Sequence, residues 1–174
     1  MSSNLPASPD QNSALEPEGI YLSAPFQARY RLLQGWGEQP DHYSRFRIAG
    51  VPLRGHNGLD FDLPPGTAVL AVAGGQVVEV GEDRVGYGRF LVMAHWWGES
   101  LYAHLQTIQV TCGARVERGQ RLGSAGASGL CETPHLHLGV RITPYNRRDG
   151  WGGYVNPLPF LDPAGILIPS RRPF

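Results

Sequence analysis

The chain has 174 residues, 41% of them hydrophobic, and a formal net charge of zero at pH 7. This length allows one domain with a substantial core, and the composition is neither that of a disordered chain nor that of a membrane protein, because the apolar runs are far shorter than the roughly 20 residues that span a bilayer. The balanced charge gives no field that would favour a nucleic acid as partner.

The amino-terminal residues 1–20 are expected to form a flexible polar leader. They lack the basic start and apolar run of a classical secretory signal. Residues 21–174 are expected to form a single domain with its core at about 50–162. Within it, 21–26 and 28–34 are short strand candidates, and a helical turn is predicted over 40–47.

From residue 59 onward, apolar and polar residues alternate in short segments bounded by glycine or proline. No stretch of a dozen residues has sustained helical periodicity. The fold class expected is therefore mainly β, an antiparallel sheet with little helix. A loop is predicted at 143–156 and a closing segment at 156–163. The predicted strands are 59–63, 67–73, 75–81, 89–96, 100–105, 107–111, 114–126 and 135–142.

Two segments, 66–81 and 112–126, resemble the hairpins of a barrel-sandwich hybrid, which lipoyl and biotinyl carriers also use. Those carriers need a lysine to modify, and this chain contains none, since all its basic residues are arginine. The same absence excludes Schiff-base chemistry and a lysine-containing phosphate loop. Cys112 and Cys131 lack the spacing of a metal-binding motif, which favours two reduced thiols.

Histidines provide the strongest chemical signal. In HNGLD, His56 and Asp60 are four residues apart, and on a strand they share one face with Gly58, whose missing side chain would leave room for a metal. In HLHLG, His135 and His137 share one face, opposite a row of apolar residues.

His56, Asp60 and one histidine of HLH would provide the two nitrogens and one oxygen of a catalytic zinc site. Alternate residues on a strand lie about 6.5 Å apart, too far for both histidines to bind that ion comfortably. The geometry alone leaves open which of the two binds. Each pattern also has a structural alternative: His56 and Asp60 could pair in a turn, and His104 in YAHL could lie on the surface. His42 and His95 are expected to be structural or solvated.

Taken in order, HNGLD, YAHL and PHLHLG resemble the lysostaphin/LytM-type zinc peptidases, which cleave peptide cross-links in bacterial cell walls. The segments 66–81 and 116–129 are similar to family segments as well, and the resemblance covers about residues 30–162. It implies the barrel-sandwich-hybrid fold of a peptidase domain. Two substitutions depart from the family pattern, Thr133 for a glycine and Gly139 for an acidic residue.

The resemblance also implies the roles of the site residues. One zinc ion per chain would be bound by His56, Asp60 and His137, and the catalytic groups would be His104 and His135.

The function expected is zinc-dependent endopeptidase activity, in which metal-activated water hydrolyses the peptide cross-links of bacterial peptidoglycan. Stem or bridge peptides would be the partners, and a monomer acting outside the cytoplasm is expected. The helical HExxH motif with its glutamate base is absent. Two alternatives are a non-catalytic cell-wall-binding or regulatory module and a zinc carboxypeptidase or dipeptidase acting on D-alanyl ends. The short His56–Asp60 spacing disfavours the second.

Overall fold

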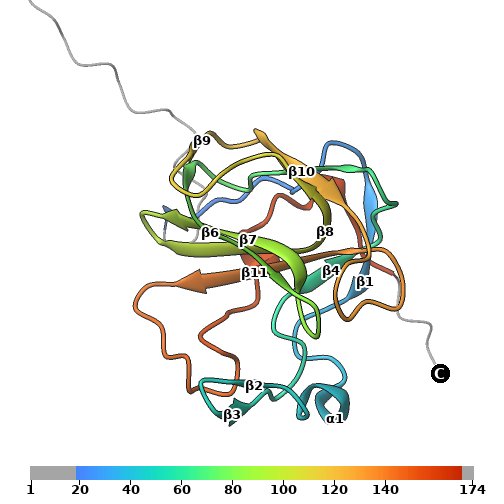
Figure 1. The fold of residues 1–174 in the computed structure, drawn as a ribbon, viewed down its shortest axis with the longest axis vertical. Helices are drawn as coiled ribbons and strands as arrows, with labels where there is room; N and C mark the ends of the chain where they lie inside the picture. Colours follow the sequence, from blue (N-terminus) through green and yellow to red (C-terminus); the bar gives the residue numbers. More distant parts are fainter. Residues whose placement is uncertain (1–18, 170–174) are drawn as a thin grey trace, which may run out of the picture.

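A computed structural model describes residues 19–169, and in them one ten-stranded sheet dominates (Figure 1). A small lobe beside it holds helix α1 (Pro40–Tyr43) and the hairpin of β2 (Arg47–Ile48) and β3 (Val51–Pro52). The sheet strands are β1 (Tyr30–Gln34), β4 (Leu59–Phe61), β5 (Ala68–Leu70), β6 (Gly75–Asp83), β7 (Gly88–His95), β8 (Gly98–Ile108), β9 (Arg115–Val116), β10 (Arg121–Ala125), β11 (Leu136–Ile142) and β12 (Ile166–Leu167).

The main strand order is β12-β1-β4-β11-β8-β7-β6-β9, and every pair is antiparallel except β1 with β12. Strand β10 joins both β5 and the far end of β8. The long strand β8 therefore pairs with β7 and β11 along its first part and with β10 near its end. This confirms the expected fold class, a mainly antiparallel β structure with little helix.

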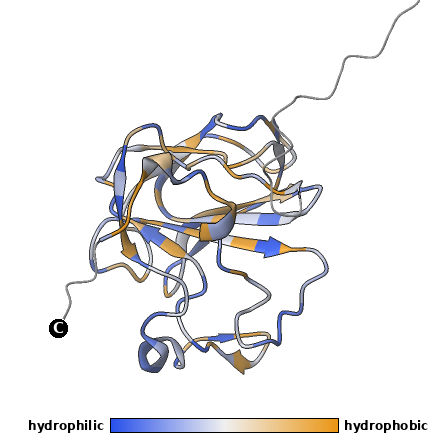
Figure 2. Cartoon of the chain, turned by 180° about the vertical axis from the view of Figure 1, so that it is seen from behind, coloured by the Kyte–Doolittle hydropathy of each residue, from blue (hydrophilic) through white to orange (hydrophobic). Residues whose placement is uncertain are grey.

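The core lies under β4, β7, β8 and β11. Tyr102, Phe61, Leu91 and Leu138 are fully buried there. Figure 2 shows apolar residues along the sheet strands, whereas helix α1 is hydrophilic. Among the described residues, no helix is long and apolar enough to cross a membrane.

The face of β11 opposite the core is also covered. Arg141 donates from Nε to the carbonyl of Gly152 at 3.0 Å and pairs with Glu99 at 3.1 Å. Its guanidinium lies 4.1 Å from the ring centre of Tyr154. Both sides of β11 are therefore packed, and the loop predicted at 143–156 is held against the polar side.

Several predicted elements agree with the structure, namely the strand at 28–34 (β1), the helical turn with Asp41 near its start (α1) and the loop at 143–156. The predicted strand at 21–26 is wrong. Only Leu22 forms an isolated bridge, to Leu161, and Pro25 has no N–H to continue the pairing.

Two other predictions need correction. The segment 107–111 is not a separate strand, because β8 continues through Ile108 where β10 pairs with it. The segment 114–126 divides into β9 and β10 at a turn in which Gly119 has φ +77°. The hairpin β2–β3 was not predicted; Ala49 and Gly50, both at positive φ, form its turn.

Most of the expected leader, 1–20, lies outside the described residues. Of its last two residues, Ile20 is buried in the main core. The same core also contains residues on either side of the range 50–162, namely Leu22, Phe26 and Ile166.

Candidate active site

Strands β4 and β11 bring together His56, Asp60 and His137. Asp60 and His137 are direct partners in the register of β4 and β11, and His56 lies just before β4. His137 Nδ1 is 2.9 Å from Asp60 Oδ1, His56 Nε2 is 3.1 Å from the same oxygen, and the two nitrogens are 3.0 Å apart. Three buried atoms that could serve as metal ligands, two nitrogens and one oxygen, therefore lie close together.

The surroundings fix which atoms of this trio can bind a cation. His56 Nδ1 is 2.9 Å from the carbonyl oxygen of Gly35. Because a carbonyl only accepts, Nδ1 carries the proton and Nε2 presents its lone pair to the trio. Burial by itself raises the pKa of Asp60, but the imidazoles of His137 and His56 beside the carboxylate outweigh it and hold the pKa well below its usual value. Burial lowers the pKa of His137.

The trio fits a zinc ion. Two imidazole nitrogens and one carboxylate oxygen form the ligand set that catalytic zinc prefers, with a position left open. Without a cation or proton among them, three electron-rich atoms at about 3 Å would repel one another. The position of His137 depends on Gly58, because a Cβ on Gly58 would lie 2.6 Å from Cε1 of His137. The expectation that Gly58 leaves room for the metal is therefore corrected: the His137 ring occupies that room.

His104 and His135 lie beside the trio. Their ring centres are 4.6 Å apart, and Nε2 of His135 is 3.6 Å from Asp60 Oδ2. His104 has a φ of +61°, an uncommon conformation that directs its ring from β8 towards His135. Burial is the main cause that lowers the pKa of His104 to about 4. All five residues expected from the sequence are thus brought together in one cluster.

One loop orients both of these imidazoles. Residues 127–134 form it, and it is closed at its base by pairing of Gly126 with His135. His104 Nδ1 lies 2.9 Å from the carbonyl of Ser128, and His135 Nδ1 lies 2.8 Å from that of Thr133. Each Nδ1 must therefore donate, which leaves the Nε2 lone pair of each neutral ring available.

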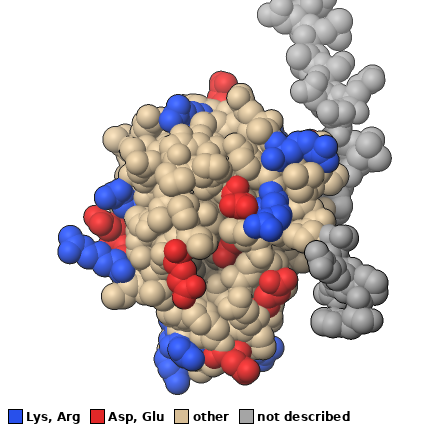
Figure 3. All heavy atoms as spheres, turned by 90° about the vertical axis from the view of Figure 1, so that its right-hand side faces the viewer, with Lys and Arg blue, Asp and Glu red and all other residues tan. Residues whose placement is uncertain are grey.

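The cluster lies in a groove of about 650 Å³. One wall comes from the lobe of α1, β2 and β3, a second from the β6–β7 turn and a third from the loop 127–134. Its charged lining residues are Arg47, Asp60, Asp83 and Glu132. Figure 3 shows acidic side chains gathered around a hollow on one face of the molecule.

Sequence reasoning missed the tyrosines that cover the metal-site candidates. The Tyr43 ring centre lies 5.2 Å from that of His56, and the Tyr87 ring centre lies 5.6 Å from that of His137. Asn57 donates to the Tyr87 hydroxyl at 3.4 Å. Burial raises the pKa of both tyrosines. No local pattern identifies them, because they come from the lobe and from a hairpin turn that are distant in sequence from the histidines.

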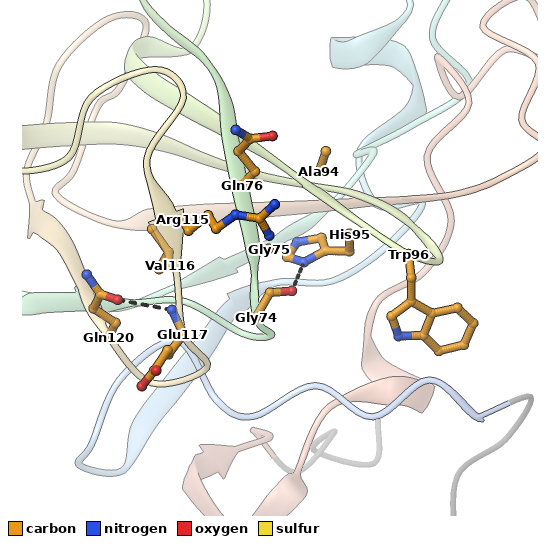
Figure 4. Close-up of a pocket in the computed structure, with 10 residues that line it drawn as sticks. All are labelled: Gly74, Gly75, Gln76, Ala94, His95, Trp96, Arg115, Val116, Glu117 and Gln120. Atoms are coloured by element: carbon orange, nitrogen blue, oxygen red, sulfur yellow. Dashed lines mark hydrogen bonds between the residues drawn. The ribbon is translucent and has the colours of Figure 1, made fainter.

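A second hollow of about 700 Å³ lies at the opposite ends of β6 and β7 (Figure 4). His95 is its histidine, and both of its ring nitrogens are satisfied, by the Gly74 carbonyl at 2.8 Å and by Ser100 Oγ at 2.7 Å. The ring also stacks on Trp97. His95 is therefore part of the packing. His42 lies on α1, against the rings of Tyr43 and Phe46, and lines the groove.

Comparison with known proteins agrees with this geometry. The chain is 30% identical over 145 residues to the glycyl-glycine endopeptidase ALE-1 of Staphylococcus capitis, covering 82% of this chain and 37% of that protein. It is 39% identical over 127 residues to the peptidoglycan DD-endopeptidase ShyB of Vibrio cholerae, covering 72% of this chain and 28% of that protein. The chain thus spans less than two fifths of the length of these relatives.

A solved structure, a zinc-containing peptidase from Vibrio cholerae, is similar with a TM-score of 0.61 at 29% identity, covering 82% of this chain and 40% of that one. Residues 54–156, more than half of the chain, match the model of peptidase family M23. This segment contains all five clustered histidine and aspartate residues. The chain therefore belongs to peptidase family M23, as the resemblance of its motifs to lysostaphin-type enzymes implied.

Proposed function

We propose that this chain is a zinc-dependent endopeptidase that hydrolyses peptide cross-links of bacterial peptidoglycan. The observation that carries the proposal is the convergence of His56 Nε2, Asp60 Oδ1 and His137 Nδ1 within 3.1 Å, beside two further imidazoles with available lone pairs. If His56, Asp60 and His137 served only to stabilise the fold, the two further imidazoles of His104 and His135 would not be required beside them.

In this proposal His56, Asp60 and His137 hold one zinc ion. When bound, zinc supplies a Lewis acid that polarises the scissile carbonyl and lowers the pKa of water. The Gly35 carbonyl keeps His56 in the tautomer that binds through Nε2. The carboxylate of Asp60 stays ionised at every pH at which such an enzyme would work, because its pKa is held low.

His135 and His104 perform the proton work. Their Nδ1 protons are committed to the carbonyls of Thr133 and Ser128, so Nε2 of either neutral ring can accept the proton of the attacking water. The resulting imidazolium can then donate to the developing oxyanion or to the leaving amine. Burial keeps His104 neutral near pH 7, which suits it to accept rather than to donate at the start.

The substrate class is supported by the groove and by the relatives. The two compared relatives are named for glycyl-glycine and DD-endopeptidase activity. Both names describe cleavage within peptides, and the groove here is walled on three sides and has a volume of about 650 Å³. The action would take place outside the cytoplasm, where peptidoglycan lies.

The test is release of soluble peptides from purified peptidoglycan, with and without a chelator. Wild-type protein should release them, chelation should abolish the release, and added zinc should restore it. Asp60→Asn should lose both the activity and the bound zinc. Its matched control is Asp62→Asn, two residues on, whose half-exposed carboxylate pairs with Arg31 at the surface.

Asp62→Asn should retain both properties. Release that resists chelation, or an active Asp60→Asn variant, would contradict the proposal. Binding of wild-type protein to peptidoglycan without any cleavage would favour the alternative of a non-catalytic wall-binding module.

A further inference from the structure

We propose that His104, His135 and Cys131 form a second metal site, specific for soft divalent cations, next to the His56–Asp60–His137 site. One donor atom from each of the three residues lies within 4.8 Å of the others. The first site offers nitrogen and oxygen ligands, whereas this one adds a sulfur. Ligand softness therefore distinguishes the two sites.

The thiol is placed by the loop that orients the two imidazoles. Cys131 Sγ donates to the Thr133 carbonyl at 2.9 Å and lies 3.3 Å from Nδ1 of His135. The Thr133 carbonyl thus contacts both the thiol and the imidazole. One short segment therefore brings the sulfur to the catalytic histidines.

The geometry is close to that of a bound ion. In a tetrahedral site with metal–sulfur bonds near 2.3 Å and metal–nitrogen bonds near 2.1 Å, neighbouring ligand atoms lie about 3.4–3.6 Å apart. The separations of up to 4.8 Å therefore require the loop to close by roughly 1 Å. Leu130 is held by a hydrogen bond from its N–H to the carbonyl of Gly86, but residues 132 and 133 are exposed, so the segment that follows Cys131 can shift with little loss of packing.

His104 can supply its lone pair without rearrangement. Its Nδ1 donates to the Ser128 carbonyl, so Nε2 is unprotonated in the neutral ring. On binding, the Cys131 thiol gives its proton to solvent and the sulfur forms a bond to the cation. Because a cation in the first site repels a second one nearby, the second site should bind more weakly than the first.

Occupation of the second site would withdraw both His104 and His135 from proton transfer. Excess soft metal should therefore inhibit hydrolysis reversibly. This consequence rests on the proposed function, but the binding itself does not, so the two can fail separately.

The test uses Cd²⁺ as the probe, added to protein already loaded with one equivalent of Zn²⁺. A thiolate-to-cadmium charge-transfer band in the ultraviolet should appear as the second equivalent binds. The band reports sulfur coordination, and the first site contains no sulfur. Cys131→Ser should lose the band and bind the second equivalent at least tenfold more weakly.

The matched control is Cys112→Ser. Cys112 is exposed and its Sγ donates to the carbonyl of Val78, away from the groove. This variant should keep the band and the second equivalent unchanged. A band that disappears in Cys112→Ser rather than in Cys131→Ser would overturn the proposal, as would uptake of only one metal ion by the wild type.

A second variant tests the role of the histidines. Asparagine adopts the positive φ of residue 104 more readily than most residues, so His104→Asn should fold. It should weaken binding of the second cadmium at least tenfold. Unchanged cadmium affinity in His104→Asn would show that Cys131 binds the ion without the histidines and would overturn the three-ligand site. None of these readouts requires peptidase activity.

Discussion

Because Gly58 has no side chain, the ring of His137 can occupy its position among the candidate metal ligands. A Cβ at this position would meet both the His137 ring at 2.6 Å and the Leu138 carbonyl at 2.6 Å. Since the carbonyl belongs to strand β11, it cannot move without disturbing the sheet. We expect Gly58→Ala to displace the His137 ring and to reduce zinc affinity at least tenfold, measured by competition with a chromogenic chelator.

Gly74→Ala is the matched control for this substitution. Its Cβ would have no neighbour closer than 3.7 Å, and its φ is not in the positive range. Zinc affinity should be unchanged in Gly74→Ala. Equal zinc affinity in wild type and Gly58→Ala would mean that His137 is not held by this contact.

His104 should make the metal-free protein sensitive to acid. Its pKa in the folded state is about 4, below the 6.5 of an unperturbed histidine, because the ring is buried. Below pH 6.5 the unfolded chain takes up a proton that the folded chain does not. Stability is therefore complete above about pH 6.5 and falls as the pH drops towards 4, by about 2 kcal/mol between pH 7.5 and pH 5.

Urea unfolding of wild type and His104→Asn at these two pH values measures this effect. The variant keeps the other titrating groups, so the difference between the two proteins isolates His104. The free energy of unfolding should fall less in the variant by about 2 kcal/mol. An identical pH dependence in the two proteins would contradict the assigned role.

At the scale of elements, strand β8 connects the core to the site. Its Tyr102 is fully buried, and its hydroxyl accepts a hydrogen bond from the backbone N–H of Val72 at 2.9 Å. Burial raises the pKa of Tyr102 to about 12. Tyr102→Phe would leave that N–H buried without a partner, so we expect a loss of about 1–3 kcal/mol in the free energy of unfolding by urea.

The control is Tyr145→Phe, in which an exposed tyrosine of the 143–156 loop is changed in the same way. Surface substitutions of this kind usually alter stability by less than about 0.5 kcal/mol. If both variants were equally stable, the Val72–Tyr102 bond would contribute little.

Elements with a clear alternation could be predicted from the sequence. In β11, apolar residues occupy one face and His137 the other, so both the strand and its chemical face follow from the pattern. Elements set by long-range pairing could not. Thr107 and Ile108 belong to β8 because β10 pairs with them, and no pattern in the neighbouring sequence predicts that pairing.

The same distinction holds for the site. The clustered histidines and Asp60 stand in short motifs, and the strand pattern accounts for Asp60 and His137, which are partners on β4 and β11. The expectation that His56 shares a strand face with Asp60 is corrected, because His56 lies before β4. His104 is directed to the site by its positive φ, which alternation does not predict. Tyr43, Tyr87 and Cys131 reach the groove from α1, a hairpin turn and a loop. Their proximity to the histidines is decided by how the lobe and the loops pack, which depends on contacts between distant parts of the chain.

At the scale of the whole molecule, zinc should contribute to stability. Its proposed ligands come from two neighbouring strands and the segment before them, so bound metal links β4 to β11. At free zinc one hundred times the dissociation constant, binding adds about 2.7 kcal/mol. Removal of zinc by a chelator should therefore lower the Tm by about 5–10 °C in calorimetry.

His137→Ala serves as the reference for that measurement. Lacking one ligand, it should unfold at the same Tm with and without the chelator. A chelator effect of equal size in wild type and in this variant would place the stabilising metal elsewhere.

The three walls of the groove are separate from the sheet that holds the histidines. They come from the α1–β2–β3 lobe, the β6–β7 turn and the loop 127–134, and each is joined to a sheet strand at both of its ends. On β4 and β11, by contrast, both faces are already committed to core packing or to chemistry. In the proposed peptidase, the wall segments can therefore be exchanged while the cluster of His56, Asp60, His104, His135 and His137 stays unaltered. For engineering of the proposed peptidase, grafting these three segments from a relative should change which peptide the groove accepts.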